Sequence, residues 1–375
     1  MNTESTDQAH HRNGTKAPQA ALSALSRDEV MSRPAAERLA WFSSLTFQHR
    51  RLEVINSYLG EVMDPNNDIK IIGLIGPTGI GKTTLLDSCL AQTVQHYAPS
   101  RKPHEVPVAM VAAPANGERS FSWRVMYRRL TEACGTVLPD KQRASTIKNG
   151  EVFALRMDRI GLAQRRELLE AEVRNRNVRL LGIDEAHHLM RFGHSEAMMD
   201  TLKSLADIQH GTKLMLVGTY QIASLFSAYG QLARRSAILH YRRYQISSRP
   251  NDASPTRDEQ EFRMILKKIA AHWPCEQVPR LEEEWQALMR MSLGCVGLLK
   301  AQLQQLASLQ TKRKGETFNS KDMFRAFKAS KMMNQMEREI VEGEEEVAGL
   351  CYGDADPASV VGGAEWIKNL EPVHA

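Results

Sequence analysis

The chain has 375 residues, of which 42 % are hydrophobic and 25 % are charged, with a mean hydropathy of −0.40. This composition is typical of a globular protein, and the length predicts two or three domains. No run of eighteen apolar residues occurs, and the first thirty residues are polar and lack the apolar core of a secretory signal. We therefore expect no membrane span and a cytoplasmic location.

The five cysteines are scattered, without a CxxC pair or a Cys/His cluster. This spacing predicts neither a disulfide framework nor a zinc site, and reduced thiols are expected. They are Cys89, Cys134, Cys275, Cys295 and Cys351.

Charge is distributed unevenly along the chain. Residues 337–375 carry ten acidic and two basic side chains, a net charge of −8, which leaves +13 on residues 1–336. A basic body with an acidic tail predicts an anionic partner for the body, and nucleic acid is the first candidate.

The hydrophobic pattern predicts five segments. They are a flexible arm (1–31), a helical lead-in (32–66) that starts at Ser32 as the cap, an α/β domain (67–250), a helical domain (251–341) and an acidic, disordered tail (342–375). Within 67–250, short apolar runs alternate with amphipathic stretches, which is typical of a parallel sheet flanked by helices. The expected strands are 71–75, 106–113, 178–183, 213–217 and 239–246, and the expected later helices are 256–271, 281–293, 295–310 and 319–341.

A glycine-rich segment after the first expected strand fits the P-loop pattern GxxxxGK[ST]. Its glycines let backbone N–H groups surround phosphates, and the following helix directs its positive end at them. Lys82 would reach the β- and γ-phosphates of ATP, and the Thr83 hydroxyl would ligate Mg²⁺. The residues expected to bind nucleotide here are Gly76, Pro77, Thr78, Gly79, Ile80, Gly81, Lys82, Thr83 and Thr84.

Paired acids end a second apolar strand about a hundred residues later. Asp184 would hold Mg²⁺ through water, and Glu185 would polarise the attacking water. Two carboxylates at this position could instead cap a helix, but together with the P-loop they indicate a hydrolysing NTPase site.

The segment Asp184-Glu185-Ala186-His187 also spells the DEAH box of superfamily 2 helicases. Such helicases need a second RecA-like domain with a QxxGRxGR motif, and the sequence after residue 250 contains neither strands nor that motif. Length and topology therefore argue against a helicase, and His187 and His188 are interpreted as helix-start residues.

The remaining pattern resembles AAA+ ATPases, which implies a five-stranded parallel sheet flanked by helices plus a helical lid. Thr219 follows a strand at the place of sensor 1. Either Arg234 or Arg235, at a helix end before the last strand, takes the place of an arginine finger acting on a neighbouring subunit's ATP; the alternative is a helix cap. Glycine stands where many relatives carry the sensor 2 arginine, and Lys300 either substitutes for it or is an ordinary helix residue.

Within the AAA+ ATPases, the chain resembles the TnsC/TniB family of transposition regulators over residues 35–335. The resemblance rests on Arg38-Leu-Ala-Trp-Phe, Phe47-Gln-His49-Arg, the loop from Gly73 to Thr83, the Ile-Asp-Glu-Ala-His-His-Leu strand end, Val217-Gly-Thr219, Leu-Ala-Arg-Arg and Gly294-Cys-Val-Gly297. It implies an ATP- and Mg²⁺-dependent homo-oligomer, a ring or filament on double-stranded DNA. It also implies a link between a TniQ- or TnsD-type target-selection protein, sometimes tied to a CRISPR effector, and the transposase.

Basic residues concentrate between Arg119 and Arg179, where fourteen Arg or Lys stand against seven Asp or Glu. In rings of this kind, elements before the Asp184 strand tend to line the channel, so phosphate contacts are expected within 119–148. The candidates are Arg119, Lys141, Arg143 and Lys148. Within 156–176, Arg and Glu interleave at helical spacing, which predicts ion pairs rather than DNA contacts.

Two other functions remain compatible with these motifs. One is a replication-initiation or helicase-loading ATPase of the Orc/Cdc6 or DnaC kind, which a terminal winged-helix module would favour. The other is a signalling or defence ATPase whose P-loop acts as a switch on a protein partner.

Overall fold

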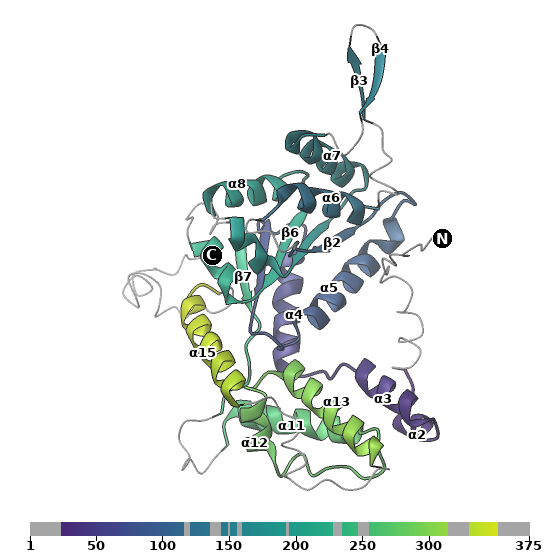
Figure 1. Cartoon of the computed structure of the whole chain (residues 1–375), viewed down its shortest axis with the longest axis vertical. Coiled ribbons are helices and arrows are strands. Elements are labelled where there is room, and N and C mark those ends of the chain that lie inside the picture. Colours follow the sequence, from purple (N-terminus) through teal and green to yellow (C-terminus); the bar gives the residue numbers. More distant parts are fainter. Residues whose placement is uncertain are drawn as a thin grey trace, which may run out of the picture. The chain divides into compact units, whose positions relative to one another are not determined.

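The computed structural model describes residues 24–115, 121–135, 144–148, 151–155, 160–192, 195–227, 235–246, 255–313 and 330–351 (Figure 1). The chain divides into two compact units. One unit combines 1–49 with 244–333, and the other combines 50–243 with 334–375. Within the described residues, no helix is both long and apolar enough to cross a membrane.

The second unit is built on a parallel five-stranded sheet in the order β2-β5-β6-β1-β7. Both faces of its strands are covered, which explains why they read as continuous apolar runs: every residue of β1 and β6 is buried. The strands are β1 (Ile71–Ile75), β2 (Val108–Ala112), β5 (Leu180–Asp184), β6 (Lys213–Gly218) and β7 (Ser236–His240). The last strand thus begins and ends earlier than the predicted 239–246.

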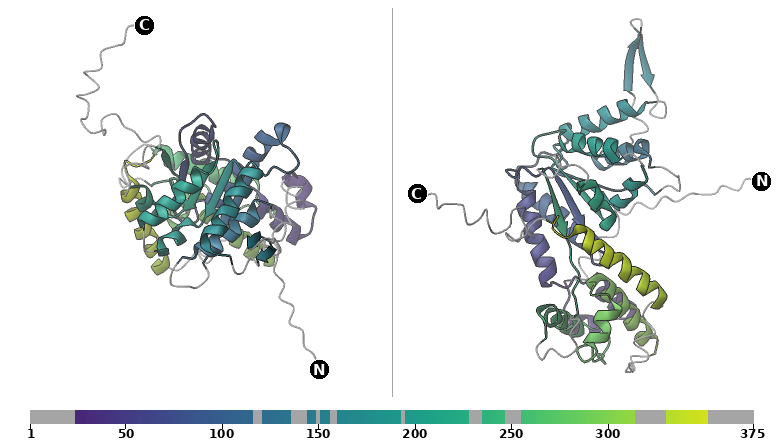
Figure 2. Two further views of the ribbon diagram at one scale, coloured as in Figure 1. Left: turned by 90° about the horizontal axis from the view of Figure 1, so that it is seen from above. Right: turned by 90° about the vertical axis from the view of Figure 1, so that its left-hand side faces the viewer.

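Helices flank this sheet on both faces, as right-handed crossovers between parallel strands require (Figure 2). On one face, α4 packs against α5, the helix that follows the P-loop; α6 and α7 pack together after β2. The helices of this unit are α4 (Arg50–Met63), α5 (Lys82–Tyr97), α6 (Trp123–Ala133), α7 (Leu162–Asn175), α8 (Ser195–Ala206) and α9 (Ala223–Ser227). Short 3₁₀ turns are η1 (Ala98–Ser100), η4 (Ala186–Phe192) and η5 (Tyr220–Ile222).

A hairpin that the hydrophobic pattern did not predict lies between β2 and β5 in the chain. Strands β3 (Ala144–Lys148) and β4 (Glu151–Leu155) pair antiparallel, and Lys148 stands opposite Glu151. The two residues that join them in the sequence are Asn149 and Gly150. Asn-Gly between two strands is the strongest short-range hairpin signal, so this element was predictable from the sequence.

The first unit is helical and joins the beginning of the chain to its later part. Trp41 and Phe42 pack with Phe262, Trp273 and the neighbouring helices in one apolar core. The elements are α2 (Arg27–Met31), α3 (Ala35–Ser44), α11 (Arg257–Ala271), α12 (Trp285–Met291) and α13 (Val296–Lys312).

Two N-terminal expectations need correction. Part of the segment expected to be a flexible arm is helix α2, which begins with a capping box at Ser26 and Glu29. Ser32, expected to cap the next helix, instead ends α2, and its hydroxyl donates to the Glu29 carbonyl. Helix α3 follows Pro34, with no side-chain cap.

The acidic tail also begins differently from expectation, because α15 (Ser330–Val347) continues past residue 342. Ile340 and Val347 are buried, and Glu344 forms a two-bond ion pair with Arg243, with distances of 2.9 and 3.0 Å. Beyond the helix, Cys351 forms a parallel bridge with Ile238 of β7. Residues 334–351 are therefore part of the α/β unit.

Candidate nucleotide-binding site

The P-loop, Asp184 and Thr219 come together because three parallel strands end at the same edge of the sheet. Ile75 at the end of β1 pairs with Gly218 of β6, and Ile183 of β5 pairs with Leu216. Strands in a sheet lie about 4.8 Å apart, so Thr219 stands between the P-loop strand and the Asp184 strand.

The P-loop itself has a backbone that its glycines make possible. Gly79 and Gly81 have φ values of 81° and 113°, a region that side chains disfavour. At Gly76 a Cβ atom would lie only 2.7 Å from the Tyr241 carbonyl oxygen, so the loop passes too close to the residue after β7 for any side chain. Thr78 and Gly79 are exposed at the tip.

Lys82 and Thr83 occupy the first turn of α5, where free backbone N–H groups attract anions. The Lys82 ammonium donates to the Gly76 and Pro77 carbonyls at 2.8 and 2.9 Å, so it is folded back over the loop that would hold phosphates. The Thr83 side chain is exposed at the helix start. These groups fit a nucleotide triphosphate, with the Thr83 hydroxyl and the Asp184 carboxylate as oxygen donors suited to Mg²⁺.

Asp184 is half-buried at the end of β5. Burial raises the pKa of its carboxyl group, while the Glu185 backbone N–H, which donates to Oδ1 at 2.8 Å, and the Lys82 charge act in the opposite direction. A bound cation would further favour the ionised form.

Glu185 has a left-handed backbone with a φ of 52°, which is uncommon for a residue other than glycine. Its side chain is 54 % exposed, and Oε2 lies 3.3 Å from Nδ1 of His187 without hydrogen-bond geometry. Burial lowers the pKa of His187, so a neutral ring faces the carboxylate. His187 and His188 lie in η4, in agreement with their interpretation as helix-start residues.

Thr219 begins η5 and makes no capping hydrogen bond with its side chain. The next residue, Tyr220, is buried, and its hydroxyl lies 3.2 Å from His240 Nε2 at the end of β7. Tyr220 also packs closely against α15, since a Cβ on Gly343 would lie 2.2 Å from its ring. Sequence patterns carry no signal for this contact, because the two residues are far apart in the chain.

Of the two finger candidates, Arg234 lies outside the described residues. Arg235 stands at the opposite edge of the sheet from the P-loop: its carbonyl accepts from the Lys70 and Ile71 N–H groups at the start of β1. Five strand residues separate these edges, about 16 Å, which is beyond the reach of an arginine toward its own P-loop. Its guanidinium is 58 % exposed and lies 4.0 Å from Asp207.

Lys300, the alternative for sensor 2, has a structural role inside the helical unit. Its ammonium donates to the Ser43 carbonyl at 2.8 Å and to the Leu45 carbonyl, and burial lowers its pKa. It thus ties α13 to the end of α3, as an ordinary helix residue would.

Of the four candidate DNA-binding residues, only Lys148 falls within the described residues. Arg119, Lys141 and Arg143 are outside the described residues, and Lys148 is the last residue of β3. The predicted ion pairs of the later segment are confirmed on α7: Arg166 and Arg174 both contact Glu170, at 2.9 and 3.3 Å. These arginines of α7 are therefore already paired with a carboxylate.

Comparison with known proteins defines the class. Residues 67–226 match the family model of the AAA domain. None of the curated proteins matches the sequence. Among solved structures, the Aeropyrum pernix ORC1 protein in complex with DNA is similar, with a TM-score of 0.50 and 15 % identity over 80 % of this chain and 68 % of that one.

Two further structures show weaker likeness. The ORC2 protein of Aeropyrum pernix in ADPNP–ADP complexes has a TM-score of 0.47 and 13 % identity over 85 % of this chain and 84 % of its own. The Thermotoga maritima RuvB Holliday junction branch migration motor has a TM-score of 0.40 and 16 % identity over 84 % and 81 %. Residues 67–226 therefore resemble the AAA domain, and the chain has the AAA+ P-loop fold with a five-stranded parallel sheet flanked by helices, which confirms the predicted fold class.

Proposed function

We propose that this protein is an ATP-dependent AAA+ regulator of DNA transposition that assembles on duplex DNA and links a target-selection protein to the transposase. The observation that carries the DNA part of the proposal is the hairpin β3–β4, inserted between β2 and β5 on the same α/β unit as the P-loop, together with the basic sequence that leads into it. Residues 141–148 contain three basic and no acidic side chains. The family resemblance of the motifs supports the transposition role.

In the proposed reaction, the P-loop backbone and Lys82 bind the ATP phosphates. Mg²⁺, held by Thr83 and through water by Asp184, would neutralise charge on the phosphates. Glu185 orients and polarises the attacking water, and its exposed carboxylate leaves room for that water beside the strand end. Thr219, between the two strands, aligns the water or contacts the γ-phosphate.

The proposal includes a homo-oligomer, and the place of Arg235 supports it. At this distance from its own P-loop, Arg235 could act as a finger only on the site of another subunit. Mixing two inactive variants tests whether the arginine acts between subunits. A Lys82→Ala subunit with its arginines intact should partly restore ATPase activity to a finger-deficient subunit with an intact P-loop. The finger-deficient subunit is made once with Arg234→Ala and once with Arg235→Ala, which also separates the two candidates. If neither substitution lowers turnover, the finger assignment fails.

Binding to duplex DNA is tested through its salt dependence. Removing one cation that binds a phosphate should reduce the slope of log affinity against log salt by about 0.9. The triple variant Lys141→Ala/Arg143→Ala/Lys148→Ala should therefore have a slope smaller by up to about 3. The control variant replaces three basic residues of the helical unit, Arg257, Lys267 and Arg280, with alanine. Equal slopes for the wild type and the hairpin variant would refute the assignment of DNA contacts to the hairpin.

The transposition role needs the intact system. A target-selection protein of the TniQ or TnsD type and the transposase should be retained on DNA by the wild type with ATP and not by Lys82→Ala. Normal nucleotide affinity and assembly of Lys82→Ala would refute the site. Loading of a replicative helicase instead of capture of a transposase would favour the initiator function.

A further inference from the structure

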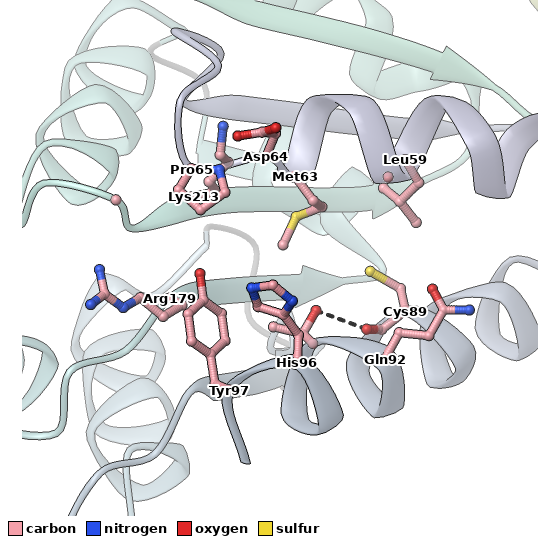
Figure 3. Close-up of a pocket in the computed structure, with 13 residues that line it drawn as sticks. Leu59, Met63, Asp64, Pro65, Cys89, Gln92, His96, Tyr97, Arg179 and Lys213 are labelled. Atoms are coloured by element: carbon pink, nitrogen blue, oxygen red, sulfur yellow. Dashed lines mark hydrogen bonds between the residues drawn. The ribbon is translucent and has the colours of Figure 1, made fainter. Parts of the chain in front are cut away.

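A second cavity, separate from the P-loop, lies in the α/β unit between α4 and α5. Its volume is about 300 Å³, at the lower end of the range for small-molecule sites. Figure 3 shows Met63 of α4 facing Cys89 and His96 of α5 across it, with Arg179 beside Tyr97. His96 comes fourteen residues after Lys82 on α5, which corresponds to about 21 Å at 1.5 Å per residue. The His96 end of the cavity is therefore far from the P-loop, where the phosphates of a nucleotide would bind.

Arg179 supplies a cation with one donor atom, Nε, that has no acceptor among the described residues. Its guanidinium lies over the Tyr97 ring, 5.6 Å from the centroid, and its Nε is buried without a hydrogen-bond partner among the described residues. The guanidinium has room because residue 211 is glycine, with a φ of 84°: a Cβ there would lie 2.8 Å from Nη1. Among the buried side-chain atoms without a hydrogen-bond partner in the described part of the chain, Arg179 Nε is the one whose residue lines this cavity.

Lys213 supplies a second cation at the same end. Its residue is only 3 % exposed, and its ammonium donates to the Asn67 and Ile69 carbonyls at 3.0 and 2.9 Å. An ammonium has three donors, so one N–H is left without an acceptor within the described part of the chain. Burial lowers the pKa of Lys213 to about 8, and an anion nearby would counteract that shift.

The rest of the lining is apolar or neutral except for Asp64, whose charge also acts on Lys213. Two cations and one carboxylate leave a net charge of +1, which matches a monoanion better than a phosphate dianion. Leu59, Met63 and the Tyr97 ring offer an apolar wall for the remainder of a ligand.

We propose that this cavity binds a monocarboxylate with an apolar body, its carboxylate held by Arg179 and Lys213. The ligand would be either a free carboxylic acid or the C-terminal carboxylate of a peptide. The ligand would lie between α4 and α5, away from the P-loop end of α5. The proposal does not depend on the role in transposition.

Calorimetry on the full chain, with saturating Mg-ADP to occupy the P-loop, tests the ligand class. The probes are 4-phenylbutyrate, its neutral amide and 3-phenylpropyl phosphate. We expect the acid to bind at least tenfold more tightly than the amide and no more weakly than the phosphate. Acetyl-Gly-Gly-Phe and its C-terminal amide form the peptide arm: tighter binding of the peptide acid than of phenylbutyrate identifies a peptide as the source.

Variants test the location. Arg179→Gln should lower the affinity for the carboxylic acid at least tenfold. Arg176 lies three residues away and is paired with Glu172, and Arg176→Gln should change this affinity less than twofold. Should Arg179→Gln not fold, Gln92→Trp at the exposed rim should block binding, and Gln95→Trp on the same helix outside the cavity should not. Equal binding of acid and amide, tighter binding of the phosphate, absence of binding by both acids, or binding unaffected by Gln92→Trp would overturn the proposal.

Discussion

One ion pair that can be removed by a single substitution contributes to the docking of α15 on the α/β unit. Glu344 and Arg243 are 17 % and 14 % exposed and form two parallel hydrogen bonds at 2.9 and 3.0 Å. We expect Glu344→Gln to weaken the docking of residues 334–347, because it leaves the Arg243 charge poorly solvated and without its carboxylate.

The magnitude follows from the exposure of the pair. Removing one partner of a fully buried pair costs about 3–5 kcal/mol, and an exposed pair contributes about 0.5 kcal/mol. With about 15 % of each side chain exposed, the cost would lie near the buried limit, but a glutamine still accepts a hydrogen bond from the guanidinium, so a cost of about 2 kcal/mol is expected. At 1.4 kcal/mol per tenfold change, local opening of the helix should become roughly thirtyfold more frequent.

Amide hydrogen exchange of residues 334–347 measures this opening directly. Glu345→Gln is the matched control, since the neighbouring side chain is exposed on the same helix and carries the same charge. A double-mutant cycle with Arg243→Gln should recover most of the loss as coupling energy. Exchange rates in Glu344→Gln equal to those in the control would refute the reasoning that the ion pair holds the helix.

Three other predictions concern the site and the tail. Glu185→Gln should keep ATP binding and slow steady-state hydrolysis, because the amide retains the shape but cannot polarise water; unchanged turnover would remove Glu185 from this role. The free energy of unfolding should fall by up to about 3 kcal/mol between pH 6.5 and pH 4 because of His240. Burial lowers the pKa of His240 in the folded protein to about 4, so the unfolded chain takes up a proton first and is stabilised relative to the folded chain. Denaturant titrations of wild type and His240→Gln at both pH values check this, and identical pH dependence of the two proteins would contradict it. Removal of residues 352–375 should leave ATPase activity and stability intact while transposition or partner capture falls; a cut at 342 would instead destabilise the unit, because it also removes the packed end of α15. Tighter DNA binding after removal of 352–375 would indicate that this segment is an electrostatic brake, and no change in any assay would leave it a solubilising tail.

The candidate nucleotide site could be predicted from the sequence because its requirements act on neighbouring residues. The glycine spacing of the P-loop reflects backbone angles and close approaches at Gly76, Gly79 and Gly81, and these requirements act within a few residues. The two acids are recognisable because they end an apolar run. The Asn149-Gly150 pair is a local signal from which the hairpin could have been predicted. The hydrophobic pattern missed it because its short strands do not alternate strongly between apolar and polar residues.

Contacts between distant segments could not be read in this way. Strand β7 was misplaced because apolar residues recur past His240, at Tyr241, Tyr244 and Ile246. Only pairing with β1 fixes where the strand starts and stops.

That this chain is a P-loop protein with alternating strands and helices could be read from its residues, because phosphate binding and parallel strands impose strict local patterns on glycine and apolar positions. Which segments belong together became visible only in the folded chain: Trp41 with Trp273 in one core, and Glu344 with Arg243 across a hundred residues of chain. The burial of Arg179 Nε, without a hydrogen-bond partner in the part of the chain that the structure describes, likewise emerged only from the packing around it. Burial and pairing depend on which surfaces meet, and a hydrophobic or charged residue in the sequence does not identify its partner.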